Sequence, residues 1–155
     1  MASAYLMGLR MLARRELCEA QVRTRLTRRQ CEPNEIEEAI ARLQHERALD
    51  DRRTALACAR TEAHLKHHGR LRALRQIETL GIAPDLARAA VAEVFEDLDE
   101  DELIAQALGR RLRHASLSEA TVVRRVHRYL LAQGFDAARV QAAISNRVAQ
   151  TSHDH

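Results

Sequence analysis

Apolar residues recur along most of the chain at spacings of three and four, which is the pattern of amphipathic helices. Short breaks containing glycine, proline or polar residues separate these stretches. Residues 26–40, 77–91 and 130–144 align with one another without a gap, and apolar residues match at the first, sixth and last positions. Their starts are separated by 51 and 53 residues. This self-similarity predicts a structural unit that occurs three times along the chain.

Each unit has the same predicted local structure. One helix ends near Gln30, Gly81 or Gly134, where a left-handed residue closes the helix, and the next begins at or near Pro33 or Pro84. A further amphipathic stretch precedes this pair, so each unit contains three helices. We therefore predict an all-α protein of three tandem three-helix repeats that form an elongated, curved molecule.

The alignment also predicts the domain boundaries. The first repeat covers residues 1–49, the second 50–97 and the third 98–150, and residues 151–155 form a disordered tail. An acidic run at 93–102 lies between the second and third repeats, and we expect a joint or a spacing helix there.

The composition agrees with a helical protein. The 155 residues include only 5 Gly and 2 Pro, which are the usual turn residues, and only 3% are aromatic residues, which favour strands. The formal net charge is only +3, but Lys66 is the sole lysine and arginine provides the remaining positive charge. Arginines concentrate in residues 10–29, 60–75 and 110–128. A GC-rich genome would give the same arginine bias without functional meaning, yet three blocks at matching places in three repeats favour basic surfaces for a polyanion.

Nine arginines from these blocks are our candidates for contact with DNA or with an acidic protein surface. A phosphate backbone bound in this way gives weak sequence preference and strong salt dependence. The alternative is a solvated helical face, in which arginines pair with neighbours such as Glu16 and Glu19. The candidates are Arg14, Arg15, Arg23, Arg70, Arg72, Arg75, Arg124, Arg125 and Arg128.

Two adjacent aspartates, Asp50 and Asp51, stand between the first and second repeats. An acid/base or metal role requires converging partners, and no His, Asp or Glu lies at a recognisable spacing from them. We expect one of them to cap the helix that follows, with a contact to a partner as the remaining alternative. The predicted structural joints are therefore Asp50, Asp51, Gly69, Gly81 and Gly134.

No other motif predicts chemistry. His64 and His68 have a spacing that can chelate zinc, but the glutamate of an HExxH motif is absent and basic neighbours repel a cation, so we expect a solvated helix end. Cys18, Cys31 and Cys58 are odd in number and lack CxxC spacing, which indicates free thiols. We predict no catalytic residues, no metal and no cofactor.

The N-terminal stretch "YLMGLRMLARR" has no apolar run of membrane-spanning or signal-peptide length, because arginines interrupt it. We expect a cytoplasmic monomer without membrane contact.

Four segments resemble the RecX family of bacterial regulatory proteins. They are "LARRELCEAQVRTRLTRR" (12–29), "IEEAIARLQHERALDDRRTALACAR" (36–60), "HGRLRALRQIETLGI" (68–82) and "TVVRRVHRYLLAQGFDAARVQAAI" (121–144), and the resemblance extends over roughly 6–148. The chain departs from the family pattern at Cys18, Gln30 and Thr54, where a serine, a glycine and an aromatic residue are common.

The resemblance implies a non-enzymatic modulator of RecA that lies in the deep groove of the RecA–DNA filament. Such a protein restrains the ATPase, strand exchange and coprotease functions of RecA. The implied partners are the RecA nucleoprotein filament and single- and double-stranded DNA. Two alternatives remain: a stand-alone DNA-binding protein, because "CEAQVRTRLTRR" resembles a helix-turn-helix, and a helical adaptor.

Overall fold

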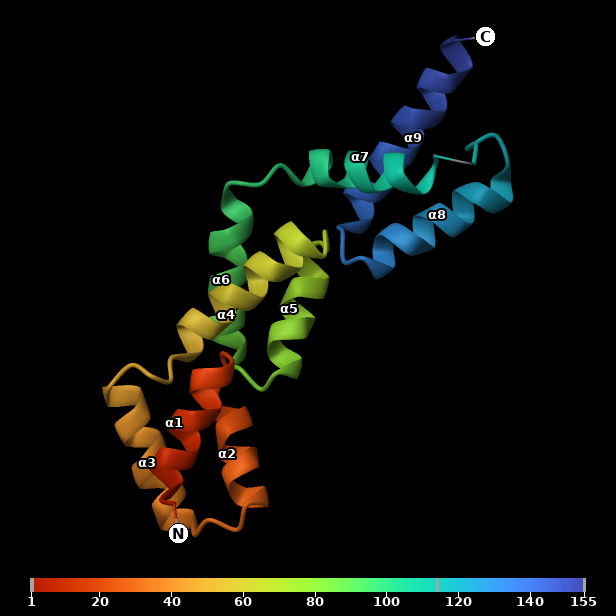
Figure 1. Cartoon of the computed structure of the whole chain (residues 1–155). Helices are drawn as coiled ribbons and strands as arrows, with labels where there is room; N and C mark the ends of the chain where they lie inside the picture. The colour runs from red at the N-terminus through yellow and green to blue at the C-terminus, as the bar shows by residue number, and fades with distance from the viewer. Residues whose placement is uncertain (1, 114, 155) are drawn as a thin grey trace. The chain divides into compact units, whose positions relative to one another are not determined.

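The computed structural model describes residues 2–113 and 115–154, and all regular structure in this part of the chain is helical (Figure 1). The all-α prediction is confirmed. The helices are α1 (Ala4–Arg14), α2 (Glu19–Arg28), α3 (Pro33–His45), α4 (Asp51–Arg60), a π-helical segment (Thr61–Leu65), α5 (Arg70–Thr79), α6 (Pro84–Glu96), α7 (Glu100–Arg111), α8 (Ala120–Ala132) and α9 (Ala137–His153).

Helices α1, α2 and α3 form a first three-helix set around a continuous core. Leu26 and Leu43, from the apolar stripes of α2 and α3, and Leu17, from the connection between α1 and α2, are fully buried in it. The Leu6 N–H donates to Ser3 Oγ at 3.2 Å and caps α1, and Pro33 occupies the first turn of α3.

Helices α7, α8 and α9 form a second core of the same kind. Ile104, Leu130 and Val140 are fully buried there. Asp99 caps α7 by accepting from the N–H groups of residues 101 and 102, and Asp136 caps α9 by accepting from the Arg139 N–H. The acidic run therefore comprises the end of α6, a short connection and the capped start of α7.

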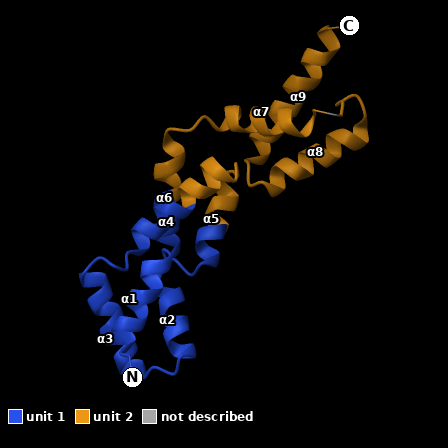
Figure 2. Cartoon of the chain, viewed as in Figure 1, with its two compact units in different colours: residues 1–58, 76–90 blue, residues 59–75, 91–155 orange. Residues whose placement is uncertain are grey.

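Along the sequence, α4, α5 and α6 stand between these two sets, and α4 continues directly into the π-helical segment. The chain separates into two compact units, shown in Figure 2: residues 1–58 with 76–90, and residues 59–75 with 91–155. The boundary falls inside α4, α5 and α6, so each unit contains one outer set and part of the middle one. The repeat boundaries after residues 49 and 97 stay a prediction.

Three left-handed turns occupy equivalent places in the three helix sets. Gln30 has φ 63°, Gly81 99° and Gly134 95°, as the alignment of the repeats predicted. Glycine adopts this conformation without steric cost, whereas Gln30 does so with a side chain.

In the first unit, the turn at Gly81 lies against the start of α2. Cys18 Sγ donates to Leu80 O at 3.0 Å, and a Cβ added to Gly81 would be 2.7 Å from Ala20 Cβ. Cys18, predicted to be a free thiol, is fully buried, and its burial raises the pKa of the thiol.

The second unit repeats this contact with backbone atoms alone. The Gly69 N–H donates to Gln133 O at 2.8 Å, and the Leu71 N–H donates to Gly134 O at 3.1 Å. A Cβ on Gly69 would be 2.5 Å from Gly134 O, and one on Gly134 would be 2.4 Å from Arg72 Cβ. Two glycines from distant parts of the sequence are therefore required for one close backbone approach.

The aspartate pair has two separate roles in the first unit. Asp50 Oδ1 accepts from the Arg53 N–H at 3.2 Å, so Asp50 caps α4 as expected of one member of the pair. Asp51 Oδ1 accepts from the Glu19 N–H at 2.7 Å, in the first turn of α2. Burial raises the pKa of the Asp51 carboxyl group, although the bond from Glu19 acts in the opposite direction.

The expected disordered tail differs from the structure. Helix α9 continues to His153, and the hydroxyl groups of Thr151 and Ser152 both donate to Val148 O. These bonds satisfy the two hydroxyl groups within the helix. Residue 155 lies outside the described residues.

No helix in the described part of the chain is long and apolar enough to span a membrane.

Candidate functional site

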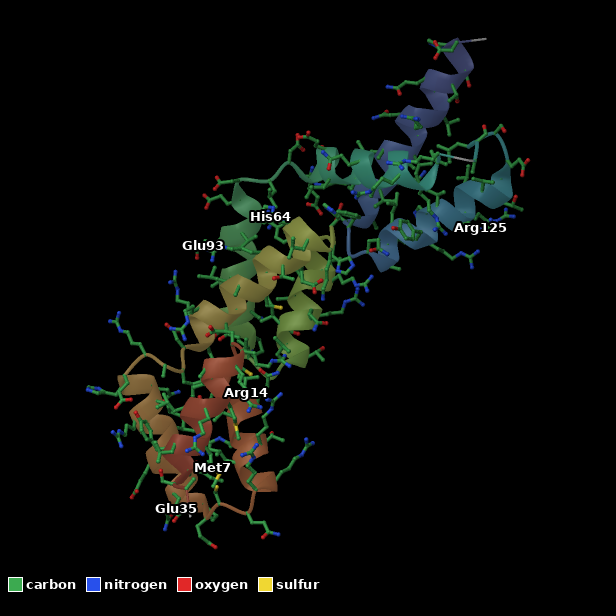
Figure 3. All side chains as sticks on the ribbon, in the orientation of Figure 1. Met7, Arg14, Glu35, His64, Glu93 and Arg125 are labelled. Atoms are coloured by element: carbon green, nitrogen blue, oxygen red, sulfur yellow. The ribbon has the colours of Figure 1, made fainter. Side chains whose placement is uncertain are left out.

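Five arginines line a groove of about 380 Å³ at the ends of α1 and α2. Arg14 and Arg15 come from the end of α1, where Figure 3 labels Arg14. The other three are Arg25, Arg28 and Arg29 at the end of α2, and Met11 contributes the apolar lining. We call this surface the five-arginine groove.

The arrangement follows from the register of α2. Val22 and Leu26 are fully buried, so residues 25, 28 and 29 lie at the side of the helix and at its end. The carbonyl ends of both helices carry partial negative charge, which favours arginine at these positions.

None of the five groove arginines forms an ion pair or a side-chain hydrogen bond with any residue that the structure describes. Two of the nearby acids have other partners: Glu16 pairs with Arg53 at 2.9 Å, and Glu19 pairs with Arg23 at 2.9 Å. Glu32, which follows Arg29 by three residues, does not line the groove. The groove is therefore strongly positive.

Arg23, a predicted contact residue, does not line the groove. Its guanidinium group forms ion pairs with Glu37 and Glu19, and these hydrogen bonds raise the pKa of Arg23. Its charge is thus balanced within α2 and α3.

The three candidates on α5 contact their own chain. Arg70 donates to Phe95 O at 3.4 Å and lies 3.7 Å from a Glu100 carboxylate oxygen. Arg72 donates to Ala132 O at 3.3 Å, beside the contact between Gly69 and Gly134. Arg75 Nε donates to Leu71 O at 3.4 Å.

The candidates on α8 are exposed. Arg124 and Arg128 line a second groove of about 340 Å³ together with His127 and Gln141, over an apolar floor of Val123 and Ile144. Arg125, labelled in Figure 3, does not line it. Within the described chain, none of these three arginines forms an ion pair or a side-chain hydrogen bond. We call this surface the α8–α9 groove.

The buried charged side chain in the described structure is Glu62, which is 2% exposed. Lys66 Nζ donates to it at 3.0 Å, and His68 Nδ1 lies 2.5 Å from it. Burial alone raises the pKa of this carboxyl group, but the hydrogen bonds with His68 and Lys66 outweigh burial, so the pKa lies below its ordinary value. His64, the other member of the predicted histidine pair, is exposed.

Glu62 and its two partners resemble a structural ion cluster more than a reactive site, because every group already has a partner. The described residues contain no cluster of three or more His, Cys, Asp or Glu that could hold a metal ion.

The structure thus brings Arg14 and Arg15 together with three arginines that our list of candidates omitted. Arg25, Arg28 and Arg29 stood in the same sequence block as Arg23, and their spacing could have suggested a common side of α2. The contacts of Arg23 with α3 could not be read from that spacing.

Comparison with known proteins bears directly on this helical arrangement. Residues 4–43, which contain the whole five-arginine groove, match the family model described as RecX, first three-helix domain. A regulatory protein RecX of Syntrophotalea carbinolica is 30% identical over 140 residues, which are 87% of this chain and 90% of the relative. The chain belongs to the RecX family.

Other relatives and structures agree with this assignment, and the family predicted from the sequence is confirmed. The regulatory protein RecX of Geobacillus kaustophilus is 28% identical over 153 residues, or 97% of this chain, and the chain spans 56% of that relative's length. The crystal structure of RecX from Lactobacillus salivarius has the same fold, with a TM-score of 0.79 at 20% identity and coverage of 94% and 95% of the two chains. The chain is therefore a member of a family of regulatory proteins.

Proposed function

We propose that this RecX-family protein binds the RecA–DNA filament and restrains the ATPase, strand exchange and coprotease activities of RecA. The observation that carries the proposal is the similarity to a regulatory protein RecX over 90% of that relative's length. The regulator acts without catalysis, by occupying a surface of the filament.

The charge distribution supports a polyanionic target. The five-arginine groove and the α8–α9 groove both present unpaired arginines to solvent. A filament of protein and DNA offers phosphate groups beside acidic protein side chains, so both grooves have possible ligands on it. Binding through these grooves depends weakly on DNA sequence and strongly on salt.

Restraint follows if one monomer contacts more than one part of the filament. A bound helical protein then opposes the subunit movements that ATP turnover and filament growth require. This mechanism needs no cofactor.

The test is ATP hydrolysis by RecA on single-stranded DNA, with and without substoichiometric amounts of the protein. We expect a lower rate, together with co-sedimentation of the protein with RecA filaments. A rate equal to that of RecA alone, without co-sedimentation, contradicts the proposal. Binding to naked DNA under those conditions would then favour a stand-alone DNA-binding protein.

A further inference from the structure

We propose that the five-arginine groove is a binding site for a run of closely spaced phosphate groups, as found in a single DNA strand or in a free phosphate chain. The assignment of this phosphate site is argued from the residues of the groove. Only the role of the site in regulating RecA rests on the proposed function.

Charge balance is the first argument. The ends of α1 and α2 contribute about one negative charge in total from their helix dipoles, against five guanidinium groups in the groove. Among the acids close by in the sequence, Glu16 and Glu19 already pair with Arg53 and Arg23, and Glu32, three residues after Arg29, does not line the groove. The remaining positive charges repel one another in the unbound protein, and an anion with several charges removes this repulsion.

The shape of the groove favours several phosphates over one. Its volume of about 380 Å³ leaves room for more than one phosphate group. Guanidinium groups bind phosphate oxygens in pairs through a planar fork, so five of them can serve consecutive phosphates. Met11 provides apolar contact without a carboxylate that would compete for the arginines.

The α8–α9 groove differs in the relevant respects. It has two arginines, a histidine and a glutamine over Val123 and Ile144, so its positive charge is smaller and its floor is more apolar. A phosphate chain should prefer the five-arginine groove.

The test measures binding by the isolated protein, without RecA, to a fluorescent thymidine oligonucleotide by fluorescence anisotropy. The variant Arg28→Ala/Arg29→Ala removes two exposed groove arginines. The matched control Arg60→Ala/Arg147→Ala removes the same charge at exposed arginines that lie outside both grooves. Circular dichroism of each variant verifies the helical fold.

We expect the groove variant to bind the oligonucleotide at least about tenfold more weakly at low salt, with a salt dependence reduced by about 0.7 for each lost phosphate contact. The control should retain the slope. The variant Arg28→Lys/Arg29→Lys, which keeps the charge but loses the planar fork, should lie between the two. Equal affinities and slopes for the groove variant and the control overturn the assignment.

Competition separates the sources of phosphate. Inorganic tripolyphosphate that displaces the oligonucleotide at equal ionic strength identifies a site open to free phosphate chains. If only oligonucleotides compete and the groove variant is impaired, the site is one for a DNA strand. Displacement by a polyglutamate peptide as strong as that by tripolyphosphate overturns phosphate recognition in favour of an acidic protein segment. If the wild-type protein binds phosphate chains but has no effect on RecA, the proposed function is contradicted and the assignment of the phosphate site stands.

Discussion

The arginines of the five-arginine groove and those of α5 come from equally basic blocks of the sequence, but they have different surroundings. Arg70 and Arg72 on α5 donate to main-chain carbonyl groups, and Arg70 also lies near a carboxylate. Arg14 and Arg28 in the groove have no such partners among the described residues. A cluster of charge in the sequence therefore indicates a binding surface only where the tertiary structure leaves the side chains unpaired.

The difference arises from what lies beside each helix. Gly69, just before α5, meets Gly134 in a close backbone contact, so the nearby Arg72 side chain reaches the carbonyl group of Ala132 at the end of α8. The groove arginines have no such partner among the described residues, and Arg14, Arg15, Arg28 and Arg29 are exposed. Changes near α5 should therefore affect stability, and changes in the groove should affect binding.

The largest expected effect is that of Gly134→Ala, which inserts a methyl group into the contact beside α5. Its Cβ would be 2.4 Å from the Arg72 Cβ and N atoms, at a residue with φ 95°. We expect the free energy of unfolding to fall by about 3 kcal/mol or more, because both overlap and backbone strain are introduced. Urea unfolding followed by circular dichroism measures it.

Gly109→Ala is the matched control, since it makes the same chemical change inside α7 where no atom lies within 4 Å of the new Cβ. Alanine favours the helix, so this variant should be up to about 1 kcal/mol more stable than the wild type. Similar unfolding free energies for the two variants would contradict the close contact.

Glu62→Gln should lower the free energy of unfolding by about 2 kcal/mol at neutral pH, because Lys66 and His68 lose a buried carboxylate partner. The folded-state pKa of Glu62 is lowered, so its stabilising contribution is present above the unfolded-state pKa of about 4.3 and is lost as the pH falls through the folded-state pKa. The difference between wild type and variant should therefore shrink on acidification. A difference that stays constant from neutral to acid pH argues against this ion cluster.

Arg72→Ala and Arg28→Ala test the comparison most directly. Arg72→Ala should cost about 1 kcal/mol of stability through its lost bond to Ala132 O and leave oligonucleotide binding unchanged. Arg28→Ala should leave stability unchanged and weaken oligonucleotide binding. Thermal unfolding and fluorescence anisotropy of both variants measure stability and binding. If Arg72→Ala weakened binding and Arg28→Ala lowered stability, the distinction between the α5 arginines and the groove arginines would be refuted.

The smallest expected effect is an increase in the free energy of unfolding. Gln30→Gly replaces an exposed residue with φ 63° by one that adopts this conformation freely, so we expect about 0.5 kcal/mol of added stability. Urea midpoints measure the change, and oligonucleotide binding by the adjacent groove should not change. A lower midpoint would show that the Gln30 side chain contributes more than its backbone strain costs.

Much of the local structure could be predicted from the sequence because it depends on neighbouring residues. Helical spacing indicated the helices, and the threefold alignment identified left-handed residues at Gln30, Gly81 and Gly134, including the one that is not glycine. The same short-range reasoning failed at residues 151–153, which belong to α9 in the structure.

The candidate site was only partly predictable. The sequence by itself determined the helical repeats, the family and the blocks of arginine, because periodicity and motifs are properties of the chain. Only the tertiary structure decided that Asp51 accepts a hydrogen bond from α2, that Arg23 and Arg72 have partners, and that five other arginines have none. The bonds of Asp51 and Arg72 join residues 32 and 60 positions apart, and Arg23 contacts Glu37 on α3 as well as Glu19 on its own helix. Whether two distant segments meet is decided by packing of the helices and not by spacing along them.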